Sequence, residues 1–110
     1  MDYETARSLL MREGTVTEAN PNSFLARLQQ GQPPIPGQVT SILLALKVLV
    51  DALQGKTQIE RELAYCLYLL AWDSRRQFEA KRRDGLGWPP LLDEDLSRIA
   101  TAVESIFAGR

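Results

Sequence analysis

The chain contains no histidine and only one cysteine, Cys66. The missing imidazole excludes histidine-based acid–base catalysis, Ser–His and Cys–His nucleophile pairs, and histidine metal ligation. A single thiol can form neither a disulfide framework nor a cysteine zinc site within one chain. We therefore expect no metal and no cofactor, and the low cysteine content favours a reducing, cytoplasmic location.

Long hydrophobic runs are absent as well. The longest, Leu63 to Trp72, has ten residues, whereas a helix that spans a bilayer needs about 20. Residues Met1 to Glu4 contain no basic segment that leads into an apolar one, so we expect no secretory signal. Both observations predict a protein without a membrane partner.

The 110 residues are 45% hydrophobic and 25% charged, a balance typical of one soluble globular domain that spans residues 1–110. Thirteen Lys and Arg residues are balanced by fourteen Asp and Glu residues, which leaves a net charge of −1. A protein that coats nucleic acid through its overall field is strongly basic. We therefore expect no direct nucleic-acid contact, and any anion site has to be local.

Glycine and proline divide the chain into five segments with helical character, and none shows the alternation of a half-buried strand. The expected fold is all-α, a compact bundle of about five helices with a long fourth helix. The expected helices span residues 2–13, 20–31, 39–54, 57–84 and 93–108. Asp2 and Asn20 are the expected N-caps of the first two, and Thr57 with Glu60 has the capping-box spacing at the start of the fourth. In the fifth helix, the residues expected to face the core are Leu96, Ile99, Ala100, Val103 and Phe107.

The third and fourth segments indicate contacts beyond one small bundle. Residues 39–54 are apolar over most of the helix circumference, as in a helix at the centre of a bundle or one covered by a second subunit. The fourth helix would be roughly 39 Å long at 1.5 Å per residue, so its C-terminal half should protrude or be shared. We therefore expect a homo-oligomer.

Two motifs suggest enzyme chemistry, and neither is complete. The sequence Gly55-Lys56-Thr57 resembles the end of a P-loop, but Val50 occupies the position of the required earlier glycine and the preceding segment is helical. We interpret it as the end of one helix followed by the start of the next. The acidic run at residues 93–95 could bind a hard metal, but acidic residues in a first helical turn also complement the helix dipole. The chain is therefore not expected to be an enzyme.

The strongest functional signal lies on the fourth helix, where aromatic residues lead directly into arginines. At about 100° per residue, the residues within about 60° of Trp72 are Tyr65, Tyr68, Arg75, Arg76, Glu79 and Arg83. Arginine forks pair with phosphate oxygens or with guanine O6 and N7, and an aromatic ring can stack on a base. The pattern is compatible with nucleotide binding. The alternative is that the aromatic residues belong to the core and the arginines form a solvated helix end.

The candidate ligand-binding residues lie on the fourth helix and around the proline-rich loop of residues 32–38. They are Tyr68, Trp72, Arg75, Arg76, Arg82, Arg83, Arg27 and Gln38. Arg7 and Arg12 are further cations that could contribute. Trp88 is either a lid on the core or an exposed stacking platform, and burial is the more common state for a lone tryptophan.

Three stretches that together cover nearly the whole chain resemble a known family. They are FLARLQQGQPPIPGQVTSILLALKVL (24–49), ERELAYCLYLLAWDSRRQFEA (60–80) and WPPLLDEDLSRIATAVESIF (88–107). The family consists of small cyanobacterial proteins often labelled dethiobiotin synthetase, a label that does not fit a short chain without the P-loop glycine. It is similar to the cyanobacterial cyclic-di-GMP receptors of the CdgR type, which are linked to cell-size control through a transcription regulator of the CRP type. The R-x-x-x-R pattern of other receptors is not matched, because the fourth residue after Arg75 is Glu79.

The resemblance implies a receptor for cyclic-di-GMP that signals by changing a protein–protein contact with a CRP-type regulator. Two bidentate arginine–guanine pairs and two stacked bases give roughly 4–12 kcal/mol gross. Association costs about 4–15 kcal/mol, and micromolar binding needs about −8 kcal/mol net. One helix face is therefore too little, and we expect a site at or near an oligomer interface. The alternative function is a ligand-independent helical adaptor whose third and fourth helices dock a partner helix.

Overall fold

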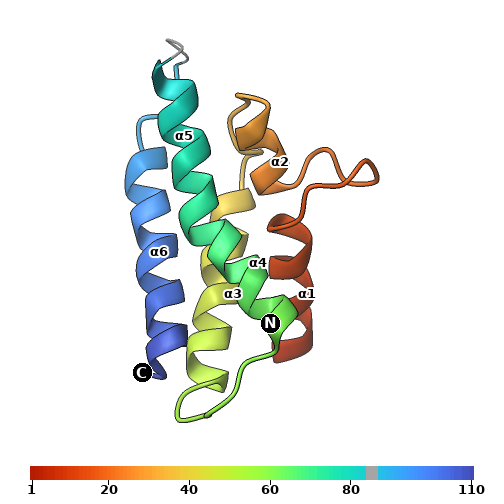
Figure 1. The fold of residues 1–110 in the computed structure, drawn as a ribbon, viewed down its shortest axis with the longest axis vertical. Helices are drawn as coiled ribbons and strands as arrows, with labels where there is room; N and C mark the ends of the chain where they lie inside the picture. Colours follow the sequence, from red (N-terminus) through yellow and green to blue (C-terminus); the bar gives the residue numbers. More distant parts are fainter. Residues whose placement is uncertain (84–86) are drawn as a thin grey trace.

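The computed structural model describes residues 1–83 and 87–110, and within them the fold is an all-α bundle (Figure 1). The helices are α1 (Tyr3–Glu13), α2 (Phe24–Gln29), α3 (Gln38–Ala52), α4 (Arg61–Tyr68), α5 (Ser74–Arg83) and α6 (Leu92–Ala108). A π-helical turn, η1 (Leu69–Asp73), joins α4 directly to α5. These three segments make one continuous helix, called the long helix below. The expected bundle of five helices is therefore confirmed for the described residues; the expected end of the long helix at Asp84 lies outside them.

The first helix begins and ends where the sequence predicts. Asp2 is its N-cap, because the Asp2 Oδ1 atom accepts a hydrogen bond from the Thr5 amide at 2.8 Å. The helix stops at Gly14, whose amide donates to the Leu10 carbonyl at 3.0 Å.

The expected start of the second helix at Asn20 is wrong. Ser23 is the N-cap of α2, and its hydroxyl oxygen accepts a hydrogen bond from the Ala26 amide at 3.1 Å. Asn20 instead stays in the preceding turn, because its side-chain amide donates to the Arg12 carbonyl at 3.3 Å. A tertiary contact with the end of α1 thus overrides the local capping signal.

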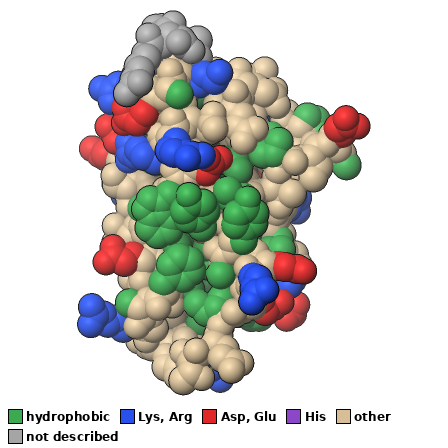
Figure 2. Space-filling model, viewed as in Figure 1, with side chains coloured by type: hydrophobic (Ala, Val, Ile, Leu, Met, Phe, Trp, Pro, Cys, Tyr) green, Lys and Arg blue, Asp and Glu red, His purple; other side chains and the backbone are tan. Residues whose placement is uncertain are grey.

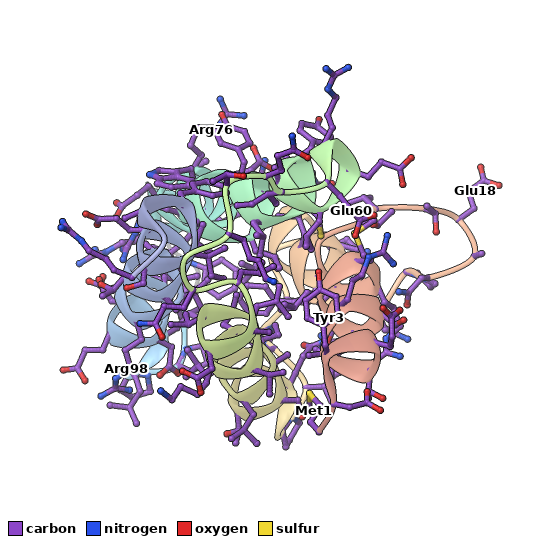
Figure 3. The ribbon with its side chains drawn as sticks, turned by 90° about the horizontal axis from the view of Figure 1, so that it is seen from below. Met1, Tyr3, Glu18, Glu60, Arg76 and Arg98 are labelled. Atoms are coloured by element: carbon purple, nitrogen blue, oxygen red, sulfur yellow. The ribbon has the colours of Figure 1, made fainter. Side chains whose placement is uncertain are left out.

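The expected capping box at Thr57 and Glu60 is also wrong. The helix begins only after Glu60, which makes no side-chain cap. Its carboxylate accepts both Nε and Nη2 of Arg7 on α1, at 2.8 and 2.9 Å, so it is not available to close a capping box. Figure 3 shows Glu60 beside α1 at this junction. The pair joins the start of the long helix to α1.

α3 forms the centre of the bundle, with α1 on one side, α6 on the other and the long helix crossing in front (Figure 1). Ile42, Leu46 and Leu49 of α3 are fully buried. Leu44 projects from the covered faces and is 57% exposed. The largely apolar circumference of α3 therefore reflects its central position, apart from this one leucine.

One of the five core residues expected on α6 is placed wrongly. Ile99 and Val103 are buried as expected, but Phe107 is 44% exposed and Ile106 takes the inward position. The buried positions alternate in steps of three and four to follow the 3.6-residue turn, and the step after Val103 is three. Phe107 therefore lies at the surface, where its ring stacks on the ring of Trp72 from the long helix.

The C-terminal half of the long helix does not simply protrude. The bundle measures 43 × 28 × 23 Å, and α5 contacts α2 while Arg75 contacts α6. Trp88, after the end of α5, is half-buried, and its indole nitrogen donates to the Phe78 carbonyl at 3.2 Å. The interpretation of Trp88 as a lid on the core is confirmed.

The Gly55 segment has none of the structure of a P-loop. Gly55 has φ +76°, follows the end of α3, and donates its amide to the Gly109 carbonyl at 3.3 Å. No named strand precedes it anywhere in the part of the chain that the structure describes. Its role is to turn the chain from α3 towards α4.

Candidate functional site

Four exposed aromatic side chains form a continuous row on one face of the bundle. The aromatic row consists of Tyr65, Tyr68, Trp72 and Phe107, which are 63%, 44%, 41% and 44% exposed. Successive rings are nearly parallel, with centroids 6.4, 5.9 and 6.2 Å apart and planes inclined by 15°, 25° and 9°. Figure 2 shows hydrophobic side chains gathered at the middle of this face, with Lys and Arg side chains beside them. The interpretation of these aromatic residues as core is therefore wrong.

A π-helical turn sets the direction in which the arginines point. Ser74 is fully buried, and its hydroxyl donates to the Leu70 carbonyl. Its amide donates to the Leu69 carbonyl, five residues earlier, as in a π-helix. The extra residue in this turn rotates everything after it by about 100° relative to an uninterrupted α-helix.

The rotation removes Arg75 from the line of the aromatic row. Its guanidinium donates to the Asp93 carboxylate at 2.6 Å, the Asp93 carbonyl at 3.0 Å and the Ser97 hydroxyl at 3.1 Å, all on α6. Glu79 lies 3.5 Å from the same guanidinium. The helical-wheel prediction that placed Arg75 beside Trp72 is wrong, because it assumed an unbroken α-helix.

Arg76 stays within about 60° of Trp72 after this rotation, and it lines the same hollow as Tyr68 of the aromatic row. Its side chain is 73% exposed, and Figure 3 shows it projecting from the long helix away from the rest of the bundle. One guanidinium nitrogen donates to Asp73 Oδ1 at 2.6 Å. This hydrogen bond raises the pKa of Arg76 above its ordinary value, so the guanidinium stays charged at every relevant pH.

A hollow of about 710 Å³ opens beside the row, between the segment after α1, α2 and the long helix. The lining includes Gly14, Leu25, Cys66, Tyr68, Asp73 and Arg76. This volume is within the range of small-molecule sites. Burial raises the pKa of the Cys66 thiol to about 11, partly opposed by a hydrogen bond with the Gly14 backbone. The thiol is therefore protonated at neutral pH and offers no nucleophile there.

The remaining arginine candidates on α5 lie away from the aromatic row or outside the described atoms. The guanidinium carbon of Arg82 lies 5.7 Å from the Phe78 ring, which in turn contacts Trp88. Arg82 is also 4.0 Å from Glu79. The backbone of Arg83 ends α5, and its side chain lies outside what the structure describes.

Arg27 and Gln38 have their polar groups engaged within the fold. Arg27 donates to the Pro33 carbonyl at 2.7 Å and to Asn22 Oδ1 at 3.2 Å. Gln38 is buried, and its amide donates to the Glu13 carboxylate at 3.3 Å and to the Asn22 carbonyl at 3.0 Å. Glu13 is itself 7% exposed. These contacts give both residues a structural role in joining the proline-rich loop to α1 and α2.

Replacing Gln38 with alanine is therefore expected to affect folding. The Glu13 carboxylate would keep the Phe24 amide and lose the Gln38 amide as a donor, and an under-satisfied buried polar group costs about 1–3 kcal/mol. Urea unfolding should show this loss. Gln32→Ala, in the same loop but exposed, is the control and should stay within ~0.5 kcal/mol of the parent. Equal midpoints for the two variants would contradict the structural role.

Sequence reasoning missed two residues of this surface. Phe107 was expected in the core, and Asp73 was not among the candidate residues. The spacing of three between Asp73 and Arg76 is the signal that could have paired them, because residues three apart lie on the same side of a helix.

Comparisons with protein-family models, with curated proteins and with solved structures find no match for this chain. No helix in the described ranges is both long and apolar enough to cross a membrane. Within residues 1–83 and 87–110, no three His, Cys, Asp or Glu side chains are grouped so that they could hold a metal ion.

Proposed function

We propose that this protein is a non-enzymatic receptor for cyclic-di-GMP. The observation that supports it most is the aromatic row, an exposed set of near-parallel rings with Arg76 beside it and a hollow along one side. Cyclic-di-GMP carries two guanine bases and two phosphates. Aromatic faces stack on bases, and arginine forks pair with phosphate oxygens or with guanine O6 and N7. The sequence resemblance supports the same ligand.

A receptor of this kind needs a way to transmit binding. We propose that the liganded surface changes a contact with a CRP-type transcription regulator, in keeping with the resemblance to receptors linked to cell-size control. A second copy of the chain would supply the contacts that one face lacks, since Tyr65 at the outer end of the row is 63% exposed. Light scattering with and without cyclic-di-GMP tests whether a second copy takes part, and a monomer under both conditions would contradict it.

The second candidate function is a ligand-independent helical adaptor. The observation that favours it is the exposed apolar surface outside the row, which includes Leu44 at 57% and Leu91 at 60% exposure. Exposed apolar surface of this kind also suits a partner helix. An adaptor would retain its partner at every nucleotide concentration, whereas the receptor would gain or lose it when cyclic-di-GMP is added.

The test is calorimetric titration of cyclic-di-GMP into the wild type and Arg76→Ala. We expect saturable binding to the wild type and a roughly ten-fold or greater loss of affinity in the variant, the scale of one lost bidentate pair. Arg98→Ala is the matched control. Arg98 is also an exposed arginine that donates to an aspartate three residues earlier, at 3.0 Å, but it lies on α6 away from Arg76 (Figure 3). No heat from the wild type at tens of micromolar would refute the receptor function.

A further inference from the structure

Asp73 occupies an unusual place for a carboxylate. Its side chain is only 9% exposed, yet it belongs to the wall of the hollow beside the aromatic row. It follows Trp72 directly and is the last residue of the π-helical turn. A charged group in such a position is costly to bury unless its oxygens have partners.

Only one of its two oxygens has a partner within the protein as described. Asp73 Oδ1 accepts from Arg76 at 2.6 Å, and no hydrogen bond to Oδ2 is made by a described residue. No side-chain nitrogen or oxygen that is fully buried in the described ranges lacks a partner. Asp73 Oδ2 is therefore not fully buried, and Asp73 is one of the residues that line the hollow. A carboxylate oxygen has two lone pairs, so Oδ1 can also accept a second hydrogen bond.

We propose that Asp73 is the residue that selects guanine over adenine, an inference that rests on the proposed cyclic-di-GMP function. A guanine presents two adjacent donors, N1–H and one N2–H, at the spacing of the two oxygens of a carboxylate. Such charge-assisted bonds are the strong ones. Adenine presents an acceptor at N1, which the carboxylate repels. Arg76, already paired with Asp73 Oδ1, is placed to donate to an acceptor of the same ligand, such as a phosphate oxygen.

The position of Asp73 suits selection better than that of the other acidic residue in the hollow. Glu62 is exposed in the first turn of α4, so its carboxylate is largely solvated and free to move. Asp73 is held on the continuous helix, with its neighbour Ser74 fully buried. A fixed, desolvated acceptor discriminates more strongly, because a ligand without the matching donors leaves it unpaired.

The test compares three ligands in calorimetric titrations: cyclic-di-GMP, cyclic-di-AMP and cyclic-di-IMP, which lacks the N2 amino groups. With the wild type we expect cyclic-di-GMP to bind about 10- to 100-fold more tightly than either of the others. In Asp73→Asn, which is nearly isosteric, this preference should fall to a few-fold. Glu62→Gln is the control in the same hollow and should keep the wild-type preference.

The outcomes separate this inference from the proposed function. If the wild type does not bind cyclic-di-GMP, the receptor function fails. If it binds cyclic-di-GMP and cyclic-di-IMP equally, the receptor function survives and the role of Asp73 is wrong, and this result does not depend on whether any variant folds. If Asp73→Asn keeps the full preference for guanine, the inference is likewise overturned.

Discussion

Trp72→Ala is expected to weaken binding of cyclic-di-GMP by about 10- to 100-fold, the largest loss of any single side chain on this surface. Trp72 is one of the two inner rings of the aromatic row and the larger of them, and its ring lies next to both Tyr68 and Phe107. Base stacking on one aromatic ring is worth about 1–3 kcal/mol by alanine substitution. Removing the Trp72 ring also breaks the row between Tyr68 and Phe107, which both stack on it. Isothermal calorimetry at fixed salt measures the effect.

Fluorescence provides an independent measurement, because the chain has only two tryptophans. Trp88→Phe leaves Trp72 as the sole indole, and its emission should change as guanine stacks on it. Trp72→Phe leaves only Trp88, whose indole nitrogen is bound to the Phe78 carbonyl, and its emission should stay constant during titration. Wild-type affinity in Trp72→Ala would place the ligand elsewhere on the molecule.

Gly14→Ala is expected to lower the free energy of unfolding by about 1–3 kcal/mol, a typical cost of overpacking. Gly14 ends α1 where it crosses α4, and an added Cβ would overlap Cys66 Sγ. The same Cβ would lie 3.0 Å from the Cys66 carbonyl oxygen and 3.1 Å from Leu70 Cγ. Backbone cannot retreat as a flexible side chain can, so the two helices would have to separate. Urea denaturation measures the change against a total stability of about 5–15 kcal/mol.

A double-mutant cycle with Cys66→Ala shows whether this contact is the cause. Removing Sγ from the Gly14→Ala background should recover part of the lost stability, while the contact with the Cys66 carbonyl keeps the recovery incomplete. The two substitutions should therefore be non-additive, as is usual for residues in contact. Strictly additive effects would show that the contact with Cys66 Sγ is not what makes alanine at position 14 destabilising.

The helices were predictable from the sequence where local signals agree with tertiary contacts. Asp2 caps the start of α1 and Gly14 ends the helix, as their local signals predict. The signals at Asn20 and Glu60 were overridden by hydrogen bonds to the Arg12 carbonyl, eight residues away, and to the Arg7 guanidinium, 53 residues away. Such contacts are not visible in a local pattern, so those two helix starts could not be derived from it.

The candidate site was predictable only in part, for a geometric reason. A regular helical wheel correctly gathers Tyr65, Tyr68 and Trp72 on one side. Beyond Trp72 it fails, because the π-helical turn depends on the burial of Ser74 and the hydrogen bond from its hydroxyl to Leu70. Burial is a property of the folded chain, so the wheel placed Arg76 on this face but could not show that Arg75 turns away to bind α6.

The contact between Trp72 and Phe107 joins the long helix to the last turns of α6, at the surface rather than in the core. A molecule that covers both rings stabilises the closed position of those turns, because it binds the docked arrangement and not the opened one. A ligand bound to the aromatic row would therefore make local opening at the end of α6 less frequent. Ligand bound at Trp72 on the long helix should therefore slow hydrogen exchange of the backbone amides near Phe107 on α6.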